Sequence, residues 1–103
     1  MINRTEIIGF DWDDSNSRKN SEKHVVSQSE AEEIFFNEPL LMLEDSKHSQ
    51  AEPRVHALGV TGDKRLLHIT FTLRQDGTLI RVISARDMHR NERAIYEQVK
   101  KDA

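Results

Sequence analysis

The stretch Ile80–Tyr96 reads IRVISARDMHRNERAIY, and it decides the fold of the C-terminal half of the chain because two kinds of element meet in it. Ile80, Val82 and Ile83 are β-branched and lie within four residues, which favours a strand. The remainder of the stretch has helical spacing. We therefore expect the chain to leave a strand here and to enter its C-terminal helix.

The helical part of this stretch rests on Met88, Ile95 and Val99, which recur at helical spacing with polar residues between them. Ser84 and Asp87 are candidate N-caps, because their side-chain oxygens can accept the first backbone N–H groups of a helix. A single arginine at such a junction is usually solvated or ion-paired, whereas several together would form a cationic patch. Four fall on this junction: Arg81, Arg86, Arg90 and Arg93.

Two further strands are expected immediately before this stretch. The segments RVHALGVT at residues 54–61 and RLLHITFTL at residues 65–73 are rich in apolar and β-branched residues. The segments between the strands, TGDK and QDGT, carry the Gly and Asp residues that are typical of turns. Strands joined by two successive hairpins predict an antiparallel meander.

Alternation along these strands separates a core face from a polar face. The odd-numbered positions from 67 to 71 are apolar and predict core, whereas His68 lies on the opposite face. Arg81 alternates with apolar neighbours and is expected on the same polar face as His68. Arg54 and His56 share a face of their strand, and the pairing register decides whether that face is the polar one.

The first part of the chain predicts a short strand and then a polar helix. IIGFDW places Ile8, Phe10 and Trp12 on one face of a strand, and we interpret Trp12 as a core residue and not as a stacking platform for a base. The aspartates that follow offer N-cap oxygens for a helix from about Ser15 to Lys23.

A second helix is predicted by a capping box of Ser27 and Glu30, and it extends to about Phe36. The apolar segment LLML that follows predicts a strand, and a polar segment after it is the longest expected loop. Asp45 and His48 lie in that loop. A lone Asp and His at this distance indicate a loop surface more than a metal site or a general base.

Length and composition limit the possible classes of protein. A chain of 103 residues predicts one domain, residues 1–103, with a single core. Hydrophobic residues make up 36% and charged residues 32%, which is compatible with a folded protein. Without cysteine there is no disulfide, thiolate metal site or cysteine nucleophile. The first residues contain no long apolar run, so we expect a cytoplasmic protein without a membrane span.

The net charge of -3 hides an asymmetry. Residues 1–52 hold 5 Lys or Arg and 12 Asp or Glu, whereas residues 53–103 hold 10 and 6. A whole-molecule field of this sign repels phosphate, so a generic nucleic-acid binder is not expected, although a local basic face can still bind it. The acidic half could offer a surface to a cationic partner.

The sequence also resembles the BrnT family, the toxin half of a bacterial type II toxin–antitoxin pair. The resemblance lies in RVISAR at residues 81–86 and ERAIY at 92–96, preceded by FDWD at 10–13, KHVVS at 23–27 and EAEEIFFNEPL at 30–40. The order and spacing of these segments extend the resemblance over nearly the whole chain.

The resemblance implies a ribonuclease with a fold similar to that of RelE. We accordingly expect an α+β fold with a twisted antiparallel sheet, two N-terminal helices and one C-terminal helix. It also implies an RNA substrate and a BrnA-type antitoxin, a small DNA-binding protein of ribbon-helix-helix kind, so that no direct DNA contact by this chain is expected. The positions that match recurrent polar positions of the family are Lys23, His24, Arg54, Arg65, Arg81, Ser84, Arg86, Glu92, Arg93 and Tyr96.

Arginine and histidine on one sheet face suit RNA cleavage without a metal, because arginine binds phosphate with paired donors and histidine exchanges a proton near neutrality. The ribose 2′-hydroxyl would attack the adjacent phosphate with help from a base, cations and an acid. No cofactor is expected. The predicted catalytic residues are Arg65, His68, Arg81 and Arg86, and the predicted RNA-binding residues are Lys23, His24, Arg54, His56, Lys64, Arg90 and Arg93.

His56 and His68 are candidates because of strand alternation and not because they match a family motif, so the identity of the general base stays open. For Glu92 and Tyr96 we favour structural roles, with Glu92 pairing with the sheet arginines and Tyr96 packing on the core. A non-catalytic module that binds RNA or an acidic protein through the same face is the main alternative function. A metal-dependent nuclease is disfavoured, because no Asp, Glu or His group recurs at ligand spacing.

Overall fold

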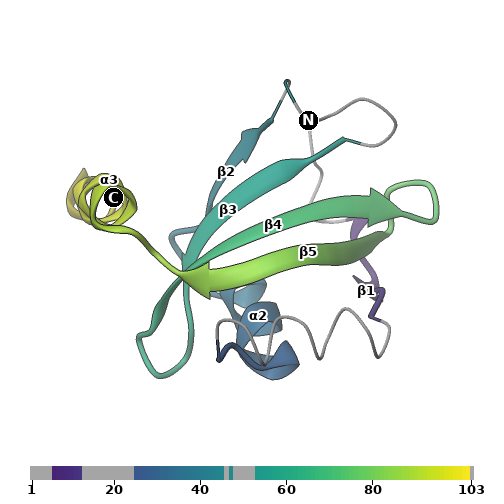
Figure 1. Ribbon diagram of the computed structural model, residues 1–103, viewed down its shortest axis with the longest axis horizontal. Helices are drawn as coiled ribbons and strands as arrows, with labels where there is room; N and C mark the ends of the chain where they lie inside the picture. Colours follow the sequence, from purple (N-terminus) through teal and green to yellow (C-terminus); the bar gives the residue numbers. More distant parts are fainter. Residues whose placement is uncertain (1–5, 13–24, 46, 48–52, 103) are drawn as a thin grey trace.

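A computed structural model describes residues 6–12, 25–45, 47 and 53–102 of the chain. Within them, five strands form one sheet in the order β1-β5-β4-β3-β2 (Figure 1). The strands are β1 Gly9–Phe10, β2 Leu41–Glu44, β3 Val55–Val60, β4 Leu66–Arg74 and β5 Leu79–Asp87. The helices of this part of the chain are α2 Gln28–Glu33, continued by the 3-10 turn η2 Ile34–Phe36, and α3 Arg90–Asp102.

The predicted meander of β3, β4 and β5 is confirmed, and β2 joins it as a further antiparallel strand. The expectation of a wholly antiparallel sheet is wrong, because β1 pairs with β5 in parallel. The N–H of Ile8 donates to the carbonyl of Thr78, and that of Asp11 donates to Ile80, each at 2.8 Å. Alternation of side chains indicates which face of a strand is buried but not whether the strand runs parallel or antiparallel to its neighbour. The direction of β1, which makes the sheet mixed, was therefore not predictable from this pattern.

The second predicted helix is confirmed together with its cap. Ser27 Oγ accepts the N–H of Glu30 at 3.0 Å, and Glu30 Oε1 accepts the N–H of Ser27 at 3.1 Å. This reciprocal pair satisfies backbone donors that the first turn of a helix leaves unpaired. The other predicted N-terminal helix, from Ser15 to Lys23, lies outside the described residues.

The C-terminal helix begins later than predicted. β5 continues through Asp87, which pairs with β4, so Ser84 and Asp87 do not cap the helix. The cap comes from Glu92, whose Oε1 accepts the N–H of His89 at 2.7 Å. Ile95 is exposed and not buried as its spacing suggested.

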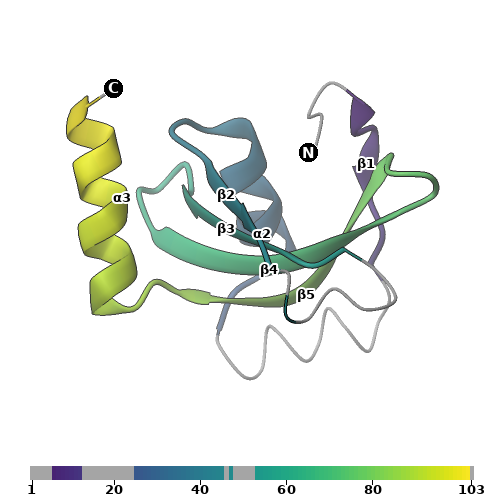
Figure 2. The same cartoon turned by 90° about the horizontal axis from the view of Figure 1, so that it is seen from above.

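Tyr96 is the helical residue that packs inward, because α3 lies at the end of the sheet and not across its face (Figures 1 and 2). Its side chain is fully buried, and its hydroxyl donates to the carbonyl of Pro39 at 2.6 Å. The predicted structural role of Tyr96 is confirmed.

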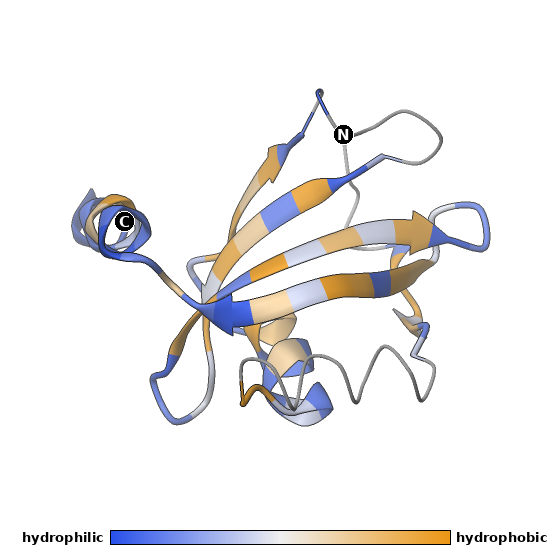
Figure 3. Cartoon of the chain, viewed as in Figure 1, coloured by the Kyte–Doolittle hydropathy of each residue, from blue (hydrophilic) through white to orange (hydrophobic). Residues whose placement is uncertain are grey.

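The core lies between the sheet and the segment of α2 and η2, which covers one face of it (Figure 2). Alternate residues of β3, β4 and β5 point into this core, which Figure 3 shows as a change of hydropathy along each strand. Phe35 packs edge-on against both Phe71 and Phe10, at 5.2 and 5.6 Å between ring centroids. Gly59 allows the close approach of this segment, because a Cβ there would lie 2.8 Å from Cβ of Ile34. The buried apolar residues of this cluster are Val26, Ala31, Ile34, Phe35, Val55, Ala57, Leu67, Ile69, Phe71, Ile80, Val82 and Ala85.

Candidate functional site

The register brings polar residues of three strands together on the sheet face opposite α2. His56 of β3 pairs with Thr70 of β4, which pairs with Ser84 of β5. In the adjacent row, His68 of β4 pairs with Arg86 of β5. The register that the sequence left open therefore places His56 on the same face as His68.

A β-bulge sets which face the β5 arginines occupy. Thr70 pairs with Ser84 while Phe71 pairs with Val82, so Ile83 is an extra residue on β5. In a regular strand, residues five positions apart point to opposite faces, and one extra residue reverses this. Arg81 and Arg86 consequently share a face. We call this surface, made of His56, His68, Thr70, Arg81, Ser84 and Arg86, the polar sheet face.

Both ring nitrogens of His56 have partners. Nε2 lies 2.9 Å from Oδ2 of Asp45, the residue after β2, and Nδ1 lies 3.0 Å from Oγ1 of Thr70. A carboxylate can only accept a hydrogen bond, so Nε2 carries the proton of this contact. In the neutral ring, Nδ1 is then the acceptor and the hydroxyl of Thr70 is its donor. His56 is thereby fixed in one tautomer with its basic lone pair on Nδ1.

His68 lies in a different environment, although its ring centroid is only 5.1 Å from that of His56. Only 8% of the residue is exposed, and its buried Nδ1 has no hydrogen-bond partner within the described part of the chain. Burial, followed by the positive charge of Arg86, lowers the pKa of His68 to about 4. Its Nε2 lies 4.0 Å from Oε2 of Glu92. His68 is therefore neutral at pH 7 and weakly basic.

Arg86 and Glu92 join the polar sheet face to α3. The two terminal nitrogens of Arg86 lie 2.8 and 2.9 Å from the two carboxylate oxygens of Glu92. Hydrogen bonding from Arg86, which outweighs the opposing effect of burial, lowers the pKa of Glu92 to about 2. The predicted pairing of Glu92 with a sheet arginine is confirmed. The planar guanidinium of Arg86 therefore already binds an anion, the Glu92 carboxylate, through two donors.

The arginine patch inferred for the strand-to-helix junction is not a bare cationic surface. Besides the pair formed by Arg86, NH1 of Arg81 lies 3.5 Å from Oδ2 of Asp11, and Arg93 donates to the carbonyl of Met88 at 3.0 Å. The positive charges of Arg81 and Arg86 are thus balanced by carboxylates from other parts of the chain, those of Asp11 and Glu92. Phosphate would bind here by replacing a carboxylate.

Arg65 is not brought to this face. It lies on the side of the sheet covered by α2, where its guanidinium contacts Asp87 at 2.7 Å and Glu30 at 3.0 Å and donates to the carbonyl of Val25 at 2.9 Å. The hydrogen bonds that Arg65 donates to the Asp87 carboxylate are the largest of the effects that raise the pKa of Arg65. Arg65 therefore connects the sheet to α2 through its contacts with Asp87 and Glu30.

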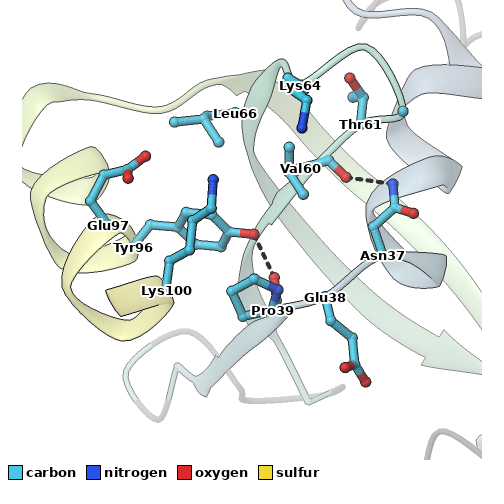
Figure 4. Close-up of a pocket in the computed structure, with 11 residues that line it drawn as sticks. Asn37, Glu38, Pro39, Val60, Thr61, Lys64, Leu66, Tyr96, Glu97 and Lys100 are labelled. Carbon is cyan, nitrogen blue, oxygen red and sulfur yellow. Dashed lines mark hydrogen bonds between the residues drawn. The ribbon is translucent and has the colours of Figure 1, made fainter. Parts of the chain in front are cut away.

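The other predicted RNA-binding residues are dispersed. Arg54 precedes β3, and its carbonyl accepts the N–H of Asp45 at 2.8 Å, whereas Arg90 and Arg93 are exposed on the first turn of α3. Lys64 lies in the exposed turn after β3, at the edge of a hollow of about 360 Å³. Figure 4 shows this hollow between that turn and α3, with Lys100 on the helical side. Lys23 and His24 lie outside the described residues.

The sequence reasoning missed Asp45 as the partner of His56, because Asp45 was considered only with His48, which lies outside the described residues. Asp45 and His56 lie eleven positions apart in the sequence, and their contact depends on the pairing of β2 with β3. Thr70 was also not singled out, although its position two residues after His68 placed it on the same face.

In the described part of the chain, no group of three or more His, Cys, Asp or Glu residues is arranged to hold a metal ion. The helices of that part are all too short or too polar to cross a membrane.

Comparison with known proteins identifies one family. Residues 12–92 match the family model described as ribonuclease toxin, BrnT, of type II toxin-antitoxin system. The matched region includes Asp45, the polar sheet face and Glu92. No curated protein matches the chain.

Proposed function

This chain belongs to the BrnT family of ribonuclease toxins, and from that premise we propose that its polar sheet face cleaves RNA by metal-independent acid and base catalysis. Family membership implies an RNA substrate and an antitoxin partner. The observation that carries the proposal is the placement of Arg81, Arg86 and two histidines on one face of the sheet, with Arg86 directly beside His68.

Arg86 is the proposed phosphate-binding residue. Its two terminal nitrogens already hold the two oxygens of Glu92, which is the geometry that a phosphate requires. A phosphate diester at this position would take over one or both donors and release the carboxylate. Arg81, on the same face, would contact a neighbouring phosphate. Both arginines would stabilise the additional negative charge of the phosphorane.

His68 borders this phosphate site as a neutral side chain. Because its pKa is lowered to about 4, it carries no charge at pH 7 that would compete with Arg86 for the phosphate. Its position beside Arg86 and Glu92 supports a part in orienting these groups around the reacting phosphate. Arg65 is left out of the proposed site because it contacts α2 on the other face.

The proposal also covers the domain, the type of fold, the location in the cell and the antitoxin partner. We propose that residues 1–103 form one toxin domain with a fold similar to that of RelE, and that the protein acts in the cytoplasm. Its partner would be a BrnA-type antitoxin of ribbon-helix-helix kind, which would contact DNA in place of this chain. The antiparallel meander of β3, β4 and β5 is the feature of the fold that supports the similarity to RelE.

One observation favours a second function, an RNA-binding module without catalysis. The sheet arginines already have carboxylate partners, so the face is also a stable structural network without RNA. Such a module would bind RNA with an affinity that falls steeply with salt and would leave the RNA intact.

Induction of the chain alone in a growing bacterial culture tests the proposal. We expect growth arrest and breakdown of total RNA on a gel. Arg86→Lys keeps the positive charge but loses the paired donors, so it should relieve both effects. Lys101→Ala, on the exposed end of α3, is the matched control and should behave as wild type. Intact RNA and continued growth with soluble wild-type protein would favour the binding module.

A further inference from the structure

We propose that His56 is the general base of RNA cleavage on the polar sheet face, and that Asp45 positions it. This inference rests on the proposed function and assigns the group that would take the proton of the ribose 2′-hydroxyl. The structural basis is a line of three side chains from three segments: Asp45 after β2, His56 on β3 and Thr70 on β4.

The contact with Asp45 gives His56 the orientation that a base needs. The Asp45 side chain is only 15% exposed, and its Oδ2 accepts from Nε2 of His56 at 2.9 Å. The carboxylate holds the proton on Nε2, leaves the lone pair on Nδ1 and stabilises the imidazolium that forms when Nδ1 takes a proton. A carboxylate on the far nitrogen of a catalytic histidine has this same effect in hydrolytic triads.

Access separates His56 from His68. The His56 side chain is 34% exposed and the His68 side chain only 11%, so a bound nucleotide has more access to His56 than to His68. The low pKa of His68 also makes it a poor base. The only group at Nδ1 of His56 within the described residues is the hydroxyl of Thr70, which can pass the proton of a 2′-hydroxyl on to Nδ1 as a relay.

The charged groups around His56 place it beside the phosphate site. Asp45 faces it from the end of β2, and His68 faces it from β4. Beyond His68 lie Arg86 of β5 and Glu92 of α3. A phosphate on Arg86 is thus separated from His56 by one imidazole ring, and the ribose that precedes this phosphate would lie over His68 and His56.

The proposed step conserves atoms and charge. The 2′-oxygen forms a bond to phosphorus while its proton passes to Nδ1 of His56. The bond from phosphorus to the 5′-oxygen then breaks, which gives a 2′,3′-cyclic phosphate and a 5′-hydroxyl. The leaving 5′-oxygen takes a proton from water, and His56 returns its proton to the hydroxide that remains.

The test uses the full chain, with purified total bacterial RNA as substrate in buffer that contains EDTA. A short 2′-O-methyl oligoribonucleotide, which lacks the nucleophile, measures binding separately. The variants are His56→Ala, Asp45→Asn and Thr70→Val. The control is Asp76→Asn in the exposed turn after β4, where the positive φ of 57° suits asparagine as well as aspartate.

We expect His56→Ala to lower the cleavage rate about 100-fold or more while its affinity for the 2′-O-methyl probe changes by less than about twofold. Asp45→Asn should also reduce the maximal rate and leave the affinity for the 2′-O-methyl probe unchanged, because the amide no longer holds the proton on Nε2 as the carboxylate does. Thr70→Val should act in the same direction as His56→Ala but less strongly, and Asp76→Asn should match wild type.

The possible failures are distinguishable. If wild-type protein leaves the RNA intact, the proposed function fails and the base assignment fails with it. If wild type cleaves and His56→Ala retains its activity, only the base assignment is overturned. Equal losses of cleavage and probe binding in His56→Ala also overturn it, because they indicate a binding role. If His56→Ala does not fold, Asp45→Asn decides: a wild-type cleavage rate, or a loss of rate matched by an equal loss of probe binding, counts against the assignment.

Discussion

Arg86 and Glu92 form a two-point ion pair, with N–O distances of 2.8 and 2.9 Å, across the boundary between the last strand and the last helix. Glu92 also accepts the N–H of His89, so one carboxylate both caps α3 and holds a sheet arginine. The candidate phosphate site and the attachment of α3 are therefore the same contact.

Loss of the Glu92 charge should destabilise the fold. Glu92→Gln keeps the size of the side chain but leaves Arg86 without an anion, and we expect the free energy of unfolding to fall by about 2 kcal/mol. Urea denaturation followed by circular dichroism measures this change. Glu97→Gln, exposed on the same helix, is the matched control. Equal stability of Glu92→Gln and Glu97→Gln would show that the ion pair contributes no net stability.

Acid should destabilise the protein through His68. Its pKa is about 4 in the folded state and near 6.5 in the unfolded chain, so between these values only the unfolded chain binds the proton. The stability is complete above pH 6.5 and falls as the pH is lowered to 4, by up to about 3 kcal/mol. Urea denaturation at a series of pH values should show this slope in wild type and a shallower one in His68→Asn. Equal slopes in wild type and His68→Asn would show that protonation of His68 does not cause the loss of stability in acid.

Tyr96 should anchor α3 through one hydrogen bond. Tyr96→Phe removes the donor to the carbonyl of Pro39 and keeps the buried ring, so we expect a loss of about 1 kcal/mol in the free energy of unfolding. Hydrogen exchange should also become faster in α3 than in the sheet. Ile95→Ala, at an exposed position of the same helix, should change neither measurement. Unaltered exchange in Tyr96→Phe would refute the anchor.

Two glycines should respond differently to a methyl group. Gly59→Ala places a Cβ 2.8 Å from Cβ of Ile34, and we expect a destabilisation of about 1–3 kcal/mol from overpacking. In Gly9→Ala the nearest atom is 3.6 Å away, an ordinary contact. Thermal unfolding of the two variants makes the comparison. A smaller effect at Gly59 than at Gly9 would mean that η2 does not pack closely on β3.

Arg65 and Arg86 should separate structure from RNA binding. Arg65→Ala removes contacts to Asp87, Glu30 and the carbonyl of Val25, so its main effect should be a lower melting temperature. The folded fraction should bind the 2′-O-methyl probe as wild type does, whereas Arg86→Lys should bind it more weakly. Weaker probe binding by folded Arg65→Ala would return Arg65 to the proposed site.

Much of the sheet was predictable because burial imposes a period of two on its strands. The alternation of Leu67, Ile69 and Phe71 with His68 placed the core face correctly. The same alternation puts Arg65 with Leu67 on the α2 side, so its position was readable from the sequence. The paired Gly and Asp residues at the turns set the meander. Local rules thus determine the part of the fold in which neighbours in sequence are neighbours in space.

The parts of the fold and of the site that the sequence did not predict depend on contacts between residues that are distant in sequence. The parallel pairing of β1 joins residues about 70 positions apart, and no local pattern encodes its direction. The contact between Asp45 and His56 required the register of β2 on β3. The carboxylates that compensate the arginines are likewise remote or lie in another element, so counting arginines overestimated the positive charge of the site.

The extra residue at Ile83 makes the composition of the site depend on chain length as well as on residue type. A one-residue deletion there would keep every side chain of the proposed site in the sequence and yet turn Arg81 toward the hydrophobic interior, away from Arg86. Such a protein would still contain the residues that identify the family. Its loss of function would then be invisible to any comparison that counts matching residues and ignores a single gap.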